Sequence, residues 1–165
     1  VAKGLTGGVV PLSATLCTER IYESFLSQDK TKAFFHGHSF TANPVGCAAS
    51  LASMDLLTEP KTMHSIESIA SHHQRFCTEL SSSPLNRYIK DVRSLGTICA
   101  LELNTKARGG YFNELADHMK IFFYDQDVLL RPLGNVVYIL PPYCSSENEL
   151  NMAYQVIWNF LECLD

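Results

Sequence analysis

Residues 87–103, RYIKDVRSLGTICALEL, decide the fold class of the chain. Apolar and polar side chains alternate on both sides of Gly96, as they do in strands that bury one face. A glycine between two such runs is typical of a turn. The stretch therefore predicts two short strands joined by a turn at Gly96.

Helices are expected on both sides of this strand pair. Upstream, apolar residues between His64 and Leu80 recur at helical spacing, and Pro60 marks a break before them. Downstream, a second helical stripe runs from Phe112 to Phe122, and its simplest interpretation is a surface that faces the core.

Two further strands and a last helix follow. Val128–Arg131 and Val136–Leu140 are the strand candidates, separated by a Pro-Leu-Gly turn. Ser146 and Glu149 match a capping box, which predicts the start of the last helix. The apolar face of that helix is Leu150, Ala153, Ile157, Leu161 and Leu164. From about residue 59 the order is thus helix, two strands, helix, two strands, helix, which predicts a compact α/β layer.

The first part of the chain does not follow this pattern. Thr18 is a candidate cap for a short helix through Ser27. Asn43 followed by Pro44 predicts a second helix, rich in small residues, that runs to about Thr58. We therefore expect two parts, residues 1–58 and residues 59–165, of which the first is the end of a different unit.

Composition excludes several classes of protein. The 165 residues are 46% hydrophobic and 18% charged, which is ordinary for a folded domain. The net charge is −4 and the basic residues are scattered, so no nucleic-acid partner is expected. No apolar run approaches the roughly 20 residues of a membrane helix, and no signal segment opens the chain. The expected location is the cytoplasm.

Cysteine and histidine do not predict a metal site. The six cysteines are spread along the chain without a C-x-x-C pair, and we interpret them as reduced core thiols. His36 and His38 form an H-x-H, and His72 and His73 are adjacent. Neither pair has a carboxylate or a cysteine nearby at ligand spacing.

Lys3 is the first candidate for chemistry. It lies in VAKGLTGG (residues 1–8), among apolar residues, where burying an ammonium group costs several kcal/mol unless the group is paired or neutralised. A phosphate loop places its lysine after the glycines, and here the lysine precedes them. A reactive amine in a cleft, able to form a Schiff base with pyridoxal phosphate, is one interpretation, and a solvated surface lysine is the other.

Two later stretches carry the other candidates. In FFHGHSFTANP (residues 34–44), Gly37 allows close approach of the backbone, and Ser39 and Thr41 are able to help hold a phosphate near a helix start. An ordinary capped loop is the alternative. In LLRPLG (residues 129–134), Arg131 offers a fork for a carboxylate or is simply exposed, and Tyr138 lines the same cleft or belongs to the core.

Three blocks together carry a family resemblance. They are KGLTGGVVPLSATL (residues 3–16), HGHSFTANPVGCAA (residues 36–49) and LLRPLGNVVYILPPY (residues 129–143). In this order the chain resembles the C-terminal part of class III aminotransferases, in particular those of biotin synthesis. The resemblance implies an α/β fold of fold type I (aspartate-aminotransferase-like): residues 59–165 form the small α/β domain and residues 1–58 the tail of the large domain.

The same resemblance implies a cofactor and site residues. The family uses pyridoxal 5'-phosphate, which Lys3 would hold as a Schiff base before acting as the catalytic base. Ser39 would bind the cofactor phosphate across a homodimer interface, with His38 beside it at a position that is proline in some relatives. The resemblance also implies three residues that would contact the substrate: Gly37, Arg131 and Tyr138. Arg131 would bind the carboxylate of the substrate.

The substrates implied are small molecules: S-adenosylmethionine as amino donor and 7-keto-8-aminopelargonate as acceptor. One alternative is another class III aminotransferase, acting on ornithine, 4-aminobutyrate or an ω-amino acid. Family members are longer, and the part that precedes Lys3 carries further cofactor contacts. We therefore expect an incomplete C-terminal part, and as an isolated piece a non-catalytic α/β module.

Overall fold

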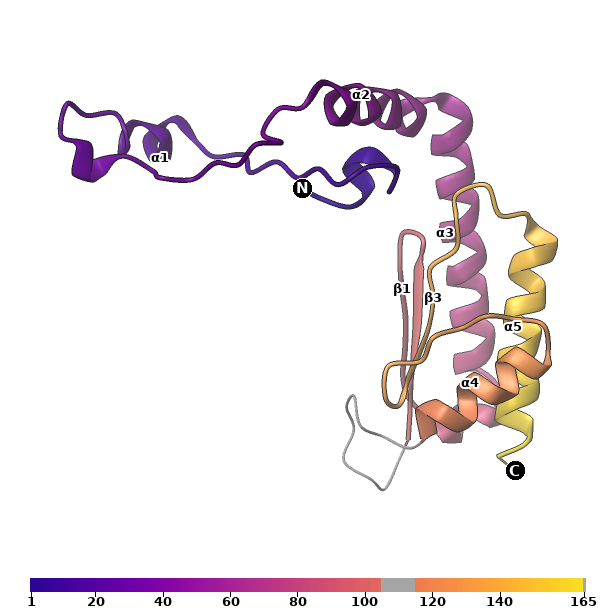
Figure 1. Ribbon diagram of the computed structural model, residues 1–165. Helices are drawn as coiled ribbons and strands as arrows, with labels where there is room; N and C mark the ends of the chain where they lie inside the picture. Colours follow the sequence, from indigo (N-terminus) through magenta and orange to yellow (C-terminus); the bar gives the residue numbers. More distant parts are fainter. Residues whose placement is uncertain (105–114, 165) are drawn as a thin grey trace. The chain divides into compact units, whose positions relative to one another are not determined.

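The computed structural model describes residues 1–104 and 115–164 and divides the chain into two compact units, residues 1–59 and residues 60–165 (Figure 1). Each unit is described by itself. Phe112, which was expected to open the second core-facing helix, lies outside the described residues.

The first unit consists of short helical elements around one longer helix. These elements are the 3-10 turn η1 (Gly4–Thr6), helix α1 (Glu19–Glu23), the 3-10 turn η2 (Lys30–Lys32) and helix α2 (Pro44–Thr58). The Asn43 side chain caps α2 by accepting a hydrogen bond from the Gly46 N–H at 2.9 Å, with Pro44 at the first helical position. The helix predicted from Asn43 to Thr58 is confirmed.

Helix α1 is shorter than predicted. It ends at Glu23 rather than at Ser27, and the Ser24 hydroxyl donates to the Ile21 carbonyl at 2.6 Å. Ile21 and Phe25, the expected apolar face, are 48% and 40% exposed. A helix this short needs tertiary packing to offset the cost of nucleation, and α1 has no buried residue.

The second unit begins directly after α2. Its elements are α3 (Pro60–Ser81), the 3-10 turn η3 (Pro84–Tyr88), β1 (Ile89–Leu95), β2 (Ile98–Leu103), α4 (Leu115–Asp125), β3 (Val136–Ile139) and α5 (Glu147–Glu162). Glu59 has extended backbone angles because a residue before proline avoids the helical region, so α2 stops there. Helix α3 starts at Pro60 itself, four residues earlier than the apolar spacing from His64 indicates.

The strands form one antiparallel sheet in the order β1-β2-β3. The strand pair predicted around Gly96 is confirmed as β1 and β2, with Leu95 opposite Ile98 and Gly96 at φ +54°. The capping box at Ser146 and Glu149 is also confirmed, and it starts α5.

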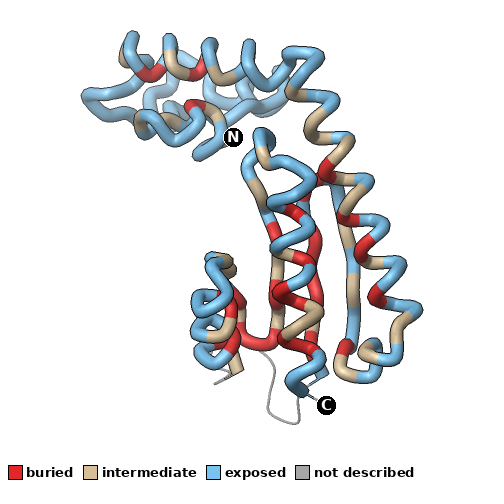
Figure 2. The backbone as a smooth tube through the Cα atoms, turned by 90° about the vertical axis from the view of Figure 1, so that its right-hand side faces the viewer, coloured by how far each residue is buried: buried red, intermediate tan, exposed pale blue. Residues whose placement is uncertain are grey.

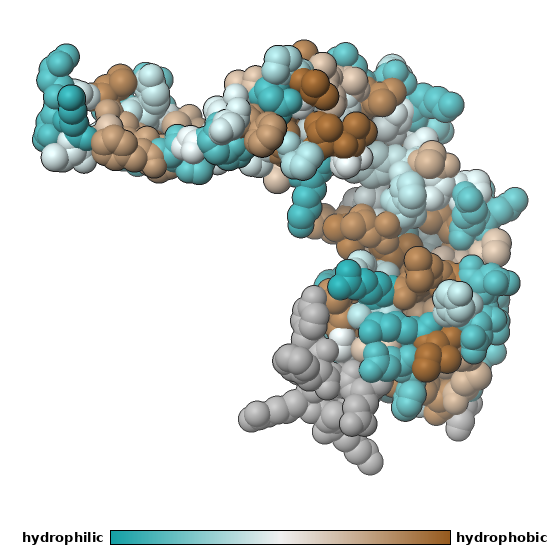
Figure 3. All heavy atoms as spheres, viewed as in Figure 1, coloured by the Kyte–Doolittle hydropathy of each residue, from teal (hydrophilic) through white to brown (hydrophobic). Residues whose placement is uncertain are grey.

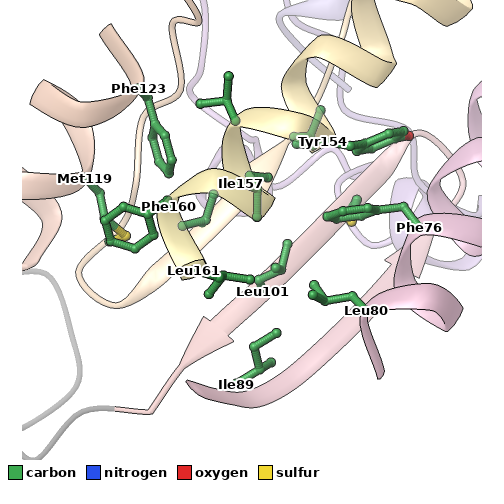
Figure 4. Close-up of a cluster of buried hydrophobic side chains, with 14 of the residues drawn as sticks. Phe76, Leu80, Ile89, Leu101, Met119, Phe123, Tyr154, Ile157, Phe160 and Leu161 are labelled. Atoms are coloured by element: carbon green, nitrogen blue, oxygen red, sulfur yellow. The ribbon is translucent and has the colours of Figure 1, made fainter. Parts of the chain in front are cut away.

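A hydrophobic core joins the sheet to the helices of this unit. Alternate residues of β2 and β3, including Leu101 and Val137, are buried against α3 and α5, and α4 adds Met119 and Phe123 (Figures 2 and 4). Burying a side chain of this size stabilises the fold by about 1.5–3 kcal/mol. Leu164, expected on the buried face of the last helix, is instead exposed beyond the end of α5.

The strand predicted at Val128–Arg131 is wrong. Its residues are irregular, and the Leu130 N–H donates to the nearby Val128 carbonyl rather than to another strand. Pro132 has no N–H to give to a ladder. Only an isolated bridge, Leu133 with Val136, precedes β3, so the sheet has one strand fewer on this side than predicted.

A buried polar cluster connects α3, the β1–β2 turn and α5. His73 is fully buried, with Nε2 3.1 Å from the Thr97 carbonyl oxygen and Nδ1 2.7 Å from the Tyr154 hydroxyl. Since the carbonyl only accepts, Nε2 carries the proton and Nδ1 accepts from Tyr154. Burial lowers the pKa of His73 and raises that of Tyr154, whose ring stacks on Phe76 at 4.4 Å. This histidine is therefore a structural core residue.

No helix within the described ranges is long and apolar enough to cross a membrane. The same residues contain no group of three or more His, Cys, Asp or Glu side chains placed to hold a metal ion.

Candidate functional site

Lys3 occupies an unusual backbone conformation at the start of the first unit. Its φ is +57°, a region that side-chain-bearing residues rarely adopt and that occurs at strained functional positions. The residue is exposed rather than buried, contrary to what its apolar neighbours indicate. Within residues 1–104 and 115–164 its amine makes no hydrogen bond or ion pair. The amine is therefore available to a ligand.

The loop after Lys3 is fixed from two sides. The Ser53 hydroxyl, on α2, donates to the Gly4 carbonyl at 3.0 Å, and the buried Thr6 hydroxyl donates to the Val10 carbonyl at 2.6 Å. Gly7 and Gly8 then turn the chain with φ of +62° and +82°, angles that suit glycine. These contacts hold the backbone that presents Lys3.

Sequence patterns pointed to the glycines but not to Ser53. In the sequence it appears only as one of several small residues of α2. Its role depends on a contact 49 residues away along the chain, which no local spacing reveals.

The loop that leads into α2 presents Ser39. The His38 N–H donates to the Thr41 hydroxyl at 3.2 Å, and His38 Nδ1 accepts from the Phe40 N–H at 3.0 Å. His38 thus shapes the turn through its own ring. Gly37 and Ser39 are both exposed, and in the described chain neither the hydroxyl nor the backbone N–H of Ser39 makes a hydrogen bond. Two donors at this position are open to an anion.

Arg131 and Tyr138 belong to the second unit. Arg131 is exposed just before the buried Pro132, and its guanidinium group has no hydrogen bond or ion pair to any described residue. Tyr138 pairs with Ala100 in the sheet and is half-buried. Because Val137 and Ile139 point into the core, alternation puts Tyr138 on the sheet face away from the helices.

A tight turn relates these two residues. The bridge between Leu133 and Val136 reverses the chain, with Gly134 at φ +61°. Arg131 and Tyr138 each lie two residues outside that bridge, on its two arms. Lys3, Gly37, His38 and Ser39 are in the first unit, so the structure presents the candidate residues as two separate sets.

The chain belongs to the class III aminotransferases: the family model described as "Aminotransferase class-III" matches residues 1–161. Among curated proteins, it is 40% identical over 162 residues to an adenosylmethionine-8-amino-7-oxononanoate aminotransferase from Synechococcus elongatus, covering 98% of this chain and 37% of that protein. It is 39% identical over 156 residues to the mitochondrial bifunctional dethiobiotin synthetase/7,8-diamino-pelargonic acid aminotransferase of Oryza sativa, covering 89% of this chain and 18% of that protein. The chain thus spans 37% or less of the length of these relatives.

Solved structures agree with the family assignment. The adenosylmethionine-8-amino-7-oxononanoate aminotransferase from Methanocaldococcus jannaschii matches with a TM-score of 0.83 and 27% identity, over 98% of this chain and 37% of that one. The ornithine aminotransferase from Toxoplasma gondii matches with a TM-score of 0.75 at 22% identity, over 99% of this chain and 36% of that one, which shows the shared fold alone. The predicted fold class, part of an α/β aminotransferase fold, is confirmed.

Proposed function

We propose that the protein containing this chain transfers an amino group from S-adenosylmethionine to 7-keto-8-aminopelargonate, a step of biotin biosynthesis, with pyridoxal 5'-phosphate as cofactor. The support comes from family membership and from relatives whose names state this reaction. The observation that carries the proposal is Lys3: an exposed amine without a protein partner in the described chain, on a strained and anchored loop.

The residues present fit the cofactor by their chemistry. Lys3 supplies an amine for an aldehyde, and Ser39 supplies a hydroxyl and an N–H for a phosphate. When bound, pyridoxal phosphate supplies an electron sink for the negative charge left on a substrate carbon that has lost its proton. In the proposed site Lys3 holds the cofactor and then, as a neutral amine, takes and returns that proton at Nζ.

Arg131 and Tyr138 would position the substrate. A guanidinium group binds a carboxylate through two parallel hydrogen bonds, and the acceptor carries a carboxylate at the end of its chain. Arg131 precedes a proline and a tight turn, which limits the motion of its backbone. Tyr138 would present its ring and hydroxyl on the exposed face of the sheet, where a substrate has access.

The division of the chain into the tail of a large cofactor domain (residues 1–58) and a small domain (residues 59–165) is part of the same proposal. A homodimer of the whole protein, in which Ser39 reaches the partner's cofactor, is also part of this proposal.

The apolar surface of α2 supports further contacts of this unit. Its exposed apolar residues are Val45, Leu51, Met54, Leu56 and Leu57, and Figure 3 shows hydrophobic side chains over this helix. Analytical ultracentrifugation of the whole protein would test the dimer, and a monomer would contradict it.

Borohydride trapping tests the role of Lys3 without relying on turnover. The whole protein is incubated with pyridoxal phosphate, reduced, digested and analysed by mass spectrometry. We expect one stoichiometric adduct on the peptide that contains Lys3, absent in Lys3→Ala and retained in the control Lys30→Ala, another exposed lysine of the first unit. An adduct spread over surface lysines, or one that survives Lys3→Ala, would refute the assignment.

Amino-donor assays test the substrate. With 7-keto-8-aminopelargonate as acceptor, S-adenosylmethionine is compared with glutamate, alanine and lysine. Preference for S-adenosylmethionine supports the proposal, whereas activity with ornithine, 4-aminobutyrate or another ω-amino acid alone would assign the protein to a different branch of the family.

We also propose that the protein is located in the cytoplasm. Cell fractionation would test this location, and recovery in mitochondria, the location stated in the name of the rice relative, would contradict it.

A further inference from the structure

Two cysteines of the second unit lie in contact. The Sγ atoms of Cys77, on α3, and Cys99, on β2, are 3.5 Å apart, so the two thiols share a hydrogen bond. A disulfide requires about 2.05 Å between the sulfurs. The remaining difference is of the size that side-chain rotation and a small shift of a helix provide, so no refolding is needed to join them.

The two thiols differ in accessibility. Cys77 is partly exposed, while Cys99 is fully buried in the core between its sheet neighbours Ser94 and Ile139. Burial raises the pKa of the Cys99 thiol, and Cys77 beside it adds to this effect. A small oxidant therefore meets Cys77 first, and Cys99 is placed as the second, resolving thiol.

We propose that Cys77 and Cys99 form a disulfide under peroxide, a modification that joins α3 to the central strand of the sheet. The Cys77 sulfur attacks hydrogen peroxide, the O–O bond breaks, and Cys77 becomes a sulfenic acid with release of one water. Cys99 then attacks the Cys77 sulfur, the S–O bond breaks, and the hydroxyl group leaves as a second water with the Cys99 proton. Two thiols and one peroxide give one disulfide and two waters.

Proximity favours this outcome over further oxidation. A sulfenic acid held next to a thiol condenses with it faster than it meets a second peroxide, because the reaction has become intramolecular. The bond would close a loop between positions 22 residues apart and restrict the unfolded chain. The oxidised second unit should therefore unfold at a higher temperature than the reduced one.

The interpretation of all six cysteines as core thiols is wrong for four of them, which are exposed. The test uses the chain with these four replaced, C17S/C47S/C144S/C163S, which leaves only Cys77 and Cys99. After treatment with hydrogen peroxide, denaturation and alkylation with N-ethylmaleimide, we expect loss of both alkylated thiols and a mass two hydrogens lower. Tryptic digestion should link the peptide 76–87 to the peptide 94–106. Dithiothreitol should restore both thiols and lower the thermal midpoint again by several degrees.

Two controls make the result decisive. In the same background, Cys99→Ala should leave Cys77 to proceed to a sulfinic acid or to an intermolecular disulfide, with no linked pair of peptides. Circular dichroism before and after peroxide shows whether the fold persists. Recovery of two alkylated thiols, over-oxidation of Cys77 while Cys99 is present, or a disulfide only between chains would each overturn the proposal.

Discussion

Replacing Tyr154 by phenylalanine should destabilise the second unit through a single lost hydroxyl. The hydroxyl donates to His73 Nδ1 at 2.7 Å, and the imidazole is completely shielded from solvent. The phenylalanine ring can keep the stacking on Phe76 at 4.4 Å, so little packing is lost. The variant therefore isolates one buried hydrogen bond.

The magnitude follows from what remains buried. A hydrogen bond contributes about 0.5–1.5 kcal/mol net, and leaving its partner unsatisfied in the core costs about 1–3 kcal/mol. In the described part of the chain His73 Nδ1 accepts from no donor but Tyr154, and a rotation of the ring would break the hydrogen bond from Nε2 to the Thr97 carbonyl. We expect a loss of about 1–3 kcal/mol in the free energy of unfolding.

Urea denaturation followed by tryptophan fluorescence measures this loss. Trp158, the only tryptophan, lies in α5 with its ring 6.0 Å from that of Phe76, so its emission reports on this core. Tyr124→Phe is the matched control because that ring is 72% exposed, and we expect a change within about 0.5 kcal/mol. If Tyr154→Phe lowered the free energy of unfolding by no more than the control does, the polar cluster would not stabilise the fold, and the prediction would be wrong.

Three further changes follow from particular contacts. Burial lowers the pKa of His73 below its ordinary 6.5, so below that pH the unfolded chain binds a proton that the folded chain does not. The free energy of unfolding should therefore fall on acidification by at most about 1.4 kcal/mol per pH unit. Urea titrations between pH 7.5 and 5.5 measure this fall, which should be smaller in His73→Gln. Gly46→Ala should weaken α2, since the added methyl would lie 2.8 Å from Nδ2 of Asn43, whose side chain caps the helix. We expect faster proteolysis of the first unit in this variant than in the unchanged protein. An unchanged cleavage rate would show that the capping side chain adjusts freely. Ser146→Ala removes the cap of α5 and should cost about 1 kcal/mol in urea titrations, whereas no change would mean that Glu149 alone caps the helix.

Local sequence signals predicted several elements of both units because each of these elements carries its own pattern. The alternation around Gly96, the Asn43-Pro44 start and the capping box at Ser146 each depend on residues within a few positions of one another. The false strand at Val128–Arg131 has the same apolar composition as a strand. The backbone of this segment follows instead from Pro132 and from the end of α4, where the Val128 N–H donates a hydrogen bond to the Phe123 carbonyl.

The candidate site was predicted as a list of residues rather than as an arrangement. Lys3, Ser39 and Arg131 are recognisable because motifs of a known family surround them. Local motifs do not reveal the positive φ of Lys3 or the hydrogen bond from Ser53 to the adjacent Gly4. Lys3 is exposed in this chain, since apolar neighbours in sequence do not enclose a side chain unless other segments cover it.

The carbonyl of Thr97 has a consequence for engineering of this protein. Hairpin tips are usual places for inserted epitopes or fluorophores, because exposed turns tolerate added residues. Here the tip residues Leu95 and Gly96 are exposed, but the carbonyl of the next residue, Thr97, accepts a hydrogen bond from His73 in the core. Labels are better placed at the Ser81–Ser82 end of α3, whose hydroxyls bond only within their own turn.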